Sequence, residues 1–395
     1  MKPAIPPRWR VMFVFVLASA LSYLDRQLLS ALAPTIKLEY GLDDVQFGWL
    51  LSVFSLVYAI SSPLAGFFID RAGLTIGICS SIGLWSMAGM ATGLTGGFPS
   101  LLACRAWLGL AESGNMPASA KTIGLYLEPR ERALGSGVGQ LGITVGMVCS
   151  PLLASYVAGL FGWRAAFVVA GALGFLWIPL WLRTIRGVPV NALSASAGST
   201  GDMLRDRRLW GLVAANMFAM TTYSLWSNWT TIFFVNTFGL TQDQANYRVA
   251  WVPPIFAALG GLFGGALSLR FQRQGLSLID ARFRASLIGS SALLVTAVTP
   301  HLPNSYLAAL AIGWSFFWTV AYSANLYALP IDYFGPERAG QAVAALTMGF
   351  GLLQTVLSPL IGTMVKQSGF SLVCLVIAAM PMVSYQILRL TRKPA

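Results

Sequence analysis

The stretch VMFVFVLASALSYLDRQLLSALAPTI, residues 11–36, decides the fold of this chain. It is uncharged except for Asp25 and Arg26 in its middle, and it exceeds the ~20 residues that a helix needs to cross a bilayer. The stretch 98–120 repeats the pattern, because its only charges are Arg105 and Glu112. A charge at the bilayer centre costs roughly 2.5–3.5 kcal/mol, so a chain keeps one only where it pairs, meets water or handles a charged ligand.

The composition is that of a membrane protein. Of the 395 residues, 56% are hydrophobic and only 10% are charged, whereas a soluble domain carries about 25% charged residues. Backbone groups within hydrocarbon must bond internally, so the spans are expected to be helices. The net charge of +12 does not indicate nucleic-acid binding, because most basic residues are scattered over short connections. The four cysteines are isolated within apolar spans, which favours core packing over a disulfide or metal site.

Twelve spans fit the pattern, and the basic residues orient them. The spans are predicted at about 11–36, 46–69, 74–95, 100–127, 133–158, 164–183, 209–237, 250–270, 283–300, 305–331, 339–365 and 370–390. Nineteen of the 26 Lys and Arg residues fall on the side of both termini, and four fall on the opposite side. This asymmetry places both termini in the cytoplasm. We expect a multi-pass protein of the bacterial cytoplasmic (inner) membrane.

A polar linker divides the chain into two similar halves. Residues 184–208 include NALSASAGSTGD and separate an N-terminal six-helix bundle, 1–183, from a C-terminal six-helix bundle, 209–395. YLEPRERALGSGVG (126–139) and YFGPERAGQAVAAL (333–346) follow equivalent spans in the same orientation. The fold class predicted is therefore an all-α membrane protein with two pseudo-symmetric bundles, which can rock around a central site.

Helical spacing brings the four buried charges onto two faces. Tyr23 and Arg26 share one face of the first span, and Arg105 and Glu112, seven residues apart, share a face of the fourth. A planar guanidinium such as that of Arg26 suits a carboxylate. A substrate carboxylate that binds it would compete with Asp25 and Glu112, and an acid that loses its counter-charge takes a proton. The alternative is a static ion-pair network that only holds the two spans together.

Several segments carry a resemblance to known transporters. GFFIDRAG (66–73), with Asp70 and Arg71, resembles the signature loop of the major facilitator superfamily. Within it, YLDRQLLSALAP (23–34), CRAWLGLAESGNMPASAKTIGLYLEPRERA (104–133) and SANLYALPIDYFGPERAG (323–340) are similar to the anion:cation symporters, which include hexuronate, galactonate and sialin-type transporters. The resemblance implies proton-coupled symport of a small organic anion, a carboxylate or sugar acid, by alternating access.

The resemblance also implies roles for individual residues. By likeness to the family, Arg26 binds the substrate carboxylate, and Asp25 and Glu112 take up protons beside the interacting base Arg105. The positions that match substrate contacts of the family are Tyr23, Tyr58 and Gln140. The positions that match its gating loop are Asp70 and Arg71. Sugar-acid members often carry Asn in span 11, where this chain has Met348 and Leu352, so fewer groups remain to bind sugar hydroxyls.

The C-terminal half has no charge deep in spans 7, 8 or 11, and its polar groups are aromatic or neutral. We expect Trp226, Tyr322, Ser323 and Asn325 to form a wall for the rest of the substrate. Asn325 is the strongest of these candidates, because its amide needs partners in hydrocarbon. Ordinary helix packing is the alternative for each residue.

The sequence also bears on functions other than symport. A second, shorter likeness is to spinster-type transporters, which also carry Asp-Arg in span 1 and suggest a lysolipid or other amphiphile as cargo. An enzyme would need a nucleophile or metal constellation, and the sequence shows neither. We expect no cofactor and no metal, with the proton as coupling ion. The expected partners are a small organic anion, protons and the lipid bilayer, with no nucleic acid, and the protein is expected to be a monomer.

Overall fold

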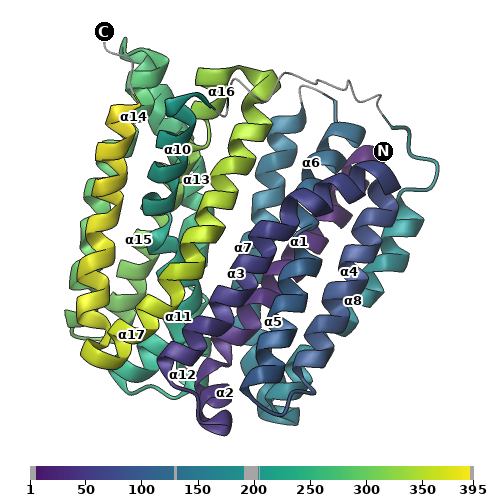
Figure 1. Ribbon diagram of the computed structural model, residues 1–395, viewed down its shortest axis with the longest axis vertical. Helices are drawn as coiled ribbons and strands as arrows, with labels where there is room; N and C mark the ends of the chain where they lie inside the picture. Colours follow the sequence, from purple (N-terminus) through teal and green to yellow (C-terminus); the bar gives the residue numbers. More distant parts are fainter. Residues whose placement is uncertain (1–5, 129–130, 191–202, 204, 392–395) are drawn as a thin grey trace, which may run out of the picture. The chain divides into compact units, whose positions relative to one another are not determined.

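The computed structural model describes residues 6–128, 131–190, 203 and 205–391 (Figure 1). All regular elements within these residues are helices, which confirms the predicted all-α fold class. The chain divides into two compact units: unit 1 comprises Met1–Leu42 and Trp49–Ala195, and unit 2 comprises Asp43–Gly48 and Ser196–Ala395. Most of the linker predicted at 184–208 lies outside the described residues.

Unit 1 contains the first half of the helices, drawn in purple to teal in Figure 1. These are α1 (Pro7–Ala31), α2 (Ala33–Tyr40), α3 (Asp44–Ala72, with its first five residues in unit 2), α4 (Leu74–Thr92), α5 (Phe98–Glu112), α6 (Asn115–Tyr126), α7 (Arg132–Phe161) and α8 (Trp163–Thr184). Gly73 separates α3 from α4 with a φ of 88°, a conformation that L-residues with a side chain rarely adopt. The glycine of the 66–73 loop is thus explained by the turn that it makes.

Unit 2 contains the second half of the helices, drawn in teal to yellow in Figure 1. Its helices are α10 (Arg207–Ala219), α11 (Thr221–Phe238), α12 (Gln242–Ala245), a π-helical turn (Asn246–Ala250), α13 (Pro253–Arg273), α14 (Leu278–Ala292), a 3₁₀ helix (Leu293–His301), α15 (Ser305–Leu326), α16 (Leu329–Phe334) and α17 (Pro336–Leu390). The 55 residues of α17 are two helices joined at Gly369, whose φ of 66° and ψ of −164° are not helical. The last two predicted spans meet at this kink.

Nine helices in the described part of the chain are long and apolar enough to cross a membrane. The difference from the twelve predicted spans has a structural reason. The segment Gln341–Leu390 counts once but holds the two helices that Gly369 separates. Two further predicted spans are interrupted: α5 stops at Glu112 before α6 begins, and α10 and α11 are separated by Met220. The helices α5, α6 and α10 have only 15, 12 and 13 residues, and α11, with 18 residues, is too polar to be counted.

An ion pair joins the end of α2 to the start of α8. Glu39 pairs with Arg164 at 2.7 Å and accepts a hydrogen bond from the indole N–H of Trp163 at 2.5 Å. The bond from Trp163, together with the guanidinium of Arg164, lowers the pKa of Glu39. The side chains of Glu39 and Arg164 are 38% and 42% exposed, so solvent screens the ion pair and its contribution to stability is small.

A lowered carboxylate pKa has a defined consequence for acid stability. The contribution of Glu39 should be present at neutral pH and should fade as the pH drops through about 4, where the unfolded-state carboxylate protonates first. We therefore expect Glu39→Gln to lower the melting temperature at pH 7 and to have little effect near pH 3. Thermal unfolding at both values measures this, with Asp243→Asn as an exposed control. An equal loss at both pH values would contradict the assignment.

Candidate functional site

One direct ion pair forms within the four buried charges, which we call the charged cluster (Asp25, Arg26, Arg105 and Glu112). The guanidinium of Arg26 on α1 donates two hydrogen bonds to Oε2 of Glu112 on α5, at 2.8 Å from Nη2 and 3.2 Å from Nε. The side chain of Glu112 is fully buried, whereas that of Arg26 is 22% exposed. Arg26 is therefore the end of the pair that a ligand can reach.

Three aromatic rings surround the guanidinium of Arg26. Its Cζ lies 4.8 Å from the ring centre of Tyr23, 4.7 Å from that of Phe54 and 5.1 Å from that of Tyr58. Rings at such distances attract a cation and leave its in-plane N–H groups available for hydrogen bonds. The predicted substrate residues Tyr23, Tyr58 and Arg26 are thus brought together, and the rings orient the guanidinium.

The other two charges of the cluster lie deeper and are less well satisfied. Asp25 is 3% exposed and Arg105 is 2% exposed. Oδ2 of Asp25 and Nε of Arg105 have no hydrogen-bond partner among the described residues, and Nη2 of Arg105 makes only a long bond of 3.5 Å to Thr92. A buried charge without partners costs several kcal/mol. The cluster therefore holds polar groups that are not fully satisfied in this arrangement.

Close helix packing fixes the position of the rings. A Cβ added to Gly109 of α5 would lie 2.5 Å from the backbone oxygen of Phe54 and 3.2 Å from the backbone nitrogen of Tyr58. A Cβ on Gly146 of α7 would lie 2.3 Å from the backbone oxygen of Ala20. Gly109 allows α5 to approach α3, and Gly146 allows α7 to approach α1. The first of these contacts places Phe54 and Tyr58 of α3 next to α5.

This packing predicts opposite effects for two Gly-to-Ala changes. Gly109→Ala should lower the free energy of unfolding by about 1–3 kcal/mol, because the new methyl meets backbone that must shift. Gly159→Ala on α7, where nothing lies within 4 Å, should be neutral or stabilising by up to about 1 kcal/mol. Melting temperatures of the two purified variants compare these outcomes. Equal melting temperatures of Gly109→Ala and Gly159→Ala would contradict the close approach of α5 to α3.

The predicted residues of unit 2 take part in contacts between helices. The Asn325 amide donates to the backbone oxygens of Gly264 and Ala321, both at 3.0 Å. The Tyr322 hydroxyl lies 2.7 Å from that of Ser384, and the ring is fully buried. Trp226 is 1% exposed, packs against Phe233 and leaves its N–H without a partner among the described residues, and Ser323 is half-buried. A role for these four in substrate binding stays a prediction.

The remaining predicted residues lie apart from the charged cluster. Gln140 is exposed on α7. Asp70 forms an ion pair with Lys121 at 2.9 Å, and Lys121 also donates to the backbone oxygen of Ile69 at 3.0 Å. The guanidinium of Arg71 lies 6.0 Å from the ring of Phe67. These contacts connect the C-terminal end of α3 to α6.

Two features of the charged cluster were not predicted from the sequence. Phe54 covers Arg26, and the available signal was its position four residues before Tyr58, on the same helical face. The interruption directly after Glu112 was also missed, although Ser113-Gly114 is a pair that commonly breaks helices. No group of three or more His, Cys, Asp or Glu side chains that could hold a metal occurs among the described residues.

Comparisons with known proteins find similarity over most of the chain. A family model described as Major Facilitator Superfamily matches residues 15–329. The hexuronate transporter of Escherichia coli (strain K12) is 27% identical over 385 residues, which cover 92% of this chain and 89% of that protein. The galacturonate transporter of Dickeya chrysanthemi is 25% identical over 309 residues, covering 73% of this chain and 87% of that protein.

A solved structure shows the same fold. It is that of a bacterial homolog of the human lysosomal transporter Spinster, in an inward-facing and unoccupied conformation. Its TM-score is 0.77 at 21% sequence identity, and the match covers 99% of this chain and 100% of that chain. At this level of identity the likeness concerns the fold and carries no information on cargo.

Proposed function

This chain belongs to the major facilitator superfamily and is a multi-pass membrane transporter, and from that premise we propose that it carries a small organic carboxylate together with protons. The observation that carries the proposal is the pair of Arg26 with Glu112, in which the base is accessible and the acid is fully buried. Two of its relatives are named as transporters of hexuronate and galacturonate, which are carboxylates.

Substrate and acid compete for one guanidinium. A carboxylate that enters beside Tyr23 and Tyr58 accepts hydrogen bonds from Arg26, as a charge-assisted pair. Glu112 then loses its counter-charge while it remains excluded from water. An isolated buried carboxylate is too costly to stay ionised, so it takes a proton. Binding of the anion and uptake of the proton are coupled through this exchange.

Asp25 supplies a second proton-binding position. It is as inaccessible as Arg105, and its Oδ2 lacks a hydrogen bond within the described residues, which favours the neutral acid. When Arg105 moves towards it, the charged form becomes favourable again. The two acids share two bases, so they titrate as one set and not as independent groups.

Alternating access would use this exchange. Protons and substrate neutralise the charged cluster on the side with the lower pH, and the two halves then reorient. On the other side the protons leave, and the freed carboxylates reclaim the bases and displace the substrate. We place this cycle in a bacterial cytoplasmic membrane with both termini in the cytoplasm, since the basic residues concentrate at that end of the spans.

The test is uptake into proteoliposomes under an imposed pH gradient. The purified protein should accumulate a labelled hexuronate or a simple monocarboxylate only when the outside is more acidic, and a protonophore should abolish accumulation. Transport that ignores the pH gradient would contradict proton coupling.

A parallel arm of the assay offers a fluorescent lysolipid. The alternative hypothesis of an amphiphilic substrate is supported by two apolar residues in span 11, Met348 and Leu352, which are 38% and 41% exposed. Lysolipid transport without activity towards any water-soluble acid would replace the carboxylate proposal.

A further inference from the structure

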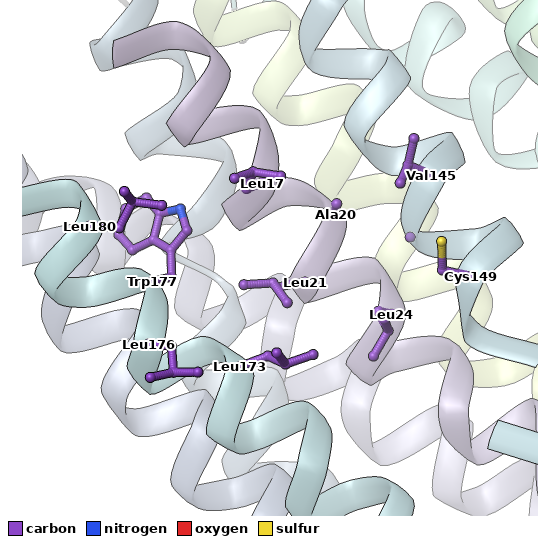
Figure 2. A pocket seen from close by; sticks show the side chains of 11 residues that line it. Leu17, Ala20, Leu21, Leu24, Val145, Cys149, Leu173, Leu176, Trp177 and Leu180 are labelled. Atoms are coloured by element: carbon purple, nitrogen blue, oxygen red, sulfur yellow. The ribbon is translucent and has the colours of Figure 1, made fainter. Parts of the chain in front are cut away.

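An apolar groove lies on the surface of unit 1 between α1, α7 and α8 (Figure 2). Its volume is about 260 Å³. Its walls are exposed leucines, such as Leu17 at 48% and Leu176 at 68%, and its floor is the buried ring of Trp177. The indole N–H of Trp177 donates to the backbone oxygen of Val14 at 2.7 Å and is therefore not available to a ligand. The groove offers hydrocarbon contacts and almost no hydrogen bonds.

The groove lies within helices that cross the membrane. α1, α7 and α8 are all long and apolar enough to do so. The lining runs from Leu17 to Leu24 on α1 and from Leu180 to Leu173 on α8. Seven helical residues span about 10 Å, a third of the ~30 Å hydrocarbon thickness. An apolar groove of this length, inside the bilayer, fits part of an extended acyl chain.

A cation continues the groove at one end. Leu173, Leu176 and Leu180 of α8 are spaced three and four residues apart, and Arg183 is the next position on that face. Arg183 is exposed and makes no ion pair with any described residue. It lies at the end of the spans that is rich in basic residues. A guanidinium there can meet a phosphate at the level of the lipid headgroups.

We propose that this groove is a binding site for an anionic phospholipid. One acyl chain lies over Trp177 between α1 and α8, and the lipid phosphate is bound by Arg183. The apolar lining explains why a chain enters, and the cation at the end of the groove explains why an anionic headgroup is preferred to a zwitterionic one. None of the four residues of the charged cluster lines the groove, and lipid binding can be measured in the absence of substrate.

Native mass spectrometry of the purified full-length protein tests the site. The protein in detergent is titrated with phosphatidylglycerol or with phosphatidylcholine of the same acyl chains, and the bound lipids are counted. We expect one tightly bound phosphatidylglycerol and weaker phosphatidylcholine. Arg183→Gln should weaken phosphatidylglycerol about five-fold, since one cation near the headgroups contributes about 1 kcal/mol. Ala20→Phe, which places a ring in the groove, should abolish the tight site.

Matched changes on α13 serve as controls, because Arg273 and Ala266 are both exposed there. Arg273→Gln and Ala266→Phe should leave lipid binding unchanged, and a melting curve for each variant shows that it is folded. Glycerophosphoglycerol, the headgroup without acyl chains, should not bind, which separates the lipid from a free phosphate ester. Equal binding of both lipids, equal effects of Arg183→Gln and Arg273→Gln, or a dimer that excludes lipid would each overturn the proposal.

Discussion

Arg26→Lys should weaken binding of the carboxylate substrate about 100-fold, although the charge is conserved. Lysine lacks the planar guanidinium that donates hydrogen bonds to both oxygens of a carboxylate. Its tetrahedral ammonium cannot stack on the rings of Tyr23, Phe54 and Tyr58 as a guanidinium does. Loss of a charge-assisted pair of hydrogen bonds costs about 3 kcal/mol, which corresponds to that factor in affinity. Substrate-induced shifts in melting temperature, together with initial rates of uptake, measure the effect.

Lysine is the informative substitution at this position. Arg26→Ala would leave the fully buried Glu112 without a counter-charge, so a loss of transport could reflect misfolding. Arg26→Lys retains a cation for Glu112 and isolates the geometry of the guanidinium. Arg273→Lys, an exposed change on α13, is the control and should bind substrate like the wild type. If Arg26→Lys also binds like the wild type, Arg26 is not the carboxylate site.

Glu112→Gln should separate transport from its driving force. Glutamine has the shape of a protonated glutamate, so the variant should exchange substrate across the membrane but should not accumulate it when a pH gradient is applied. Counterflow of labelled substrate and gradient-driven uptake, measured in the same proteoliposomes, distinguish these two activities. Asp25→Asn should show the same pattern if both acids carry protons.

The net charge moved in each transport cycle reports how many protons accompany the substrate. Symport of a monovalent anion with one proton is electroneutral, whereas symport with two protons moves one net charge, worth about 2.3 kcal/mol per 100 mV. Uptake by the wild type should respond to an imposed potential if two protons accompany the substrate, and should not respond if only one does. Glu39→Gln, whose carboxylate pairs with Arg164 away from the charged cluster, should accumulate substrate normally. Gradient-driven accumulation by both Glu112→Gln and Asp25→Asn would refute the coupling scheme.

Much of the fold could be predicted because its signals are local. Span length and apolarity are properties of consecutive residues, and the all-α class and the assignment to a transporter superfamily, with no enzyme activity expected of it, are confirmed. The interruptions after Glu112 and at Met220 were not predicted. Both breaks lie in backbone conformation, which hydropathy does not report.

The candidate site was predictable in its members and not in its pairing. Helical spacing placed Arg26 and Glu112 on inward faces, but it gave no way to decide which acid would pair with which base. In the structure Glu112 pairs with Arg26, while Asp25 and Arg105 do not form an ion pair among the described residues. For Asn325, whose amide bonds Gly264 and Ala321, burial in hydrocarbon forced the search for partners, and the nearest backbone carbonyls supplied them.

The sequence alone determined that this protein is a bundle of membrane helices with two acids and two bases inside it, because the cost of a charge in hydrocarbon makes those residues conspicuous. Tertiary structure decided how they act. The approach of α5 to α3 at Gly109 helps to place Phe54 and Tyr58 beside the guanidinium of Arg26, and that base, not its acid, is within reach of a ligand. Such an arrangement depends on distances between helices far apart in the chain, which periodicity within one helix does not contain.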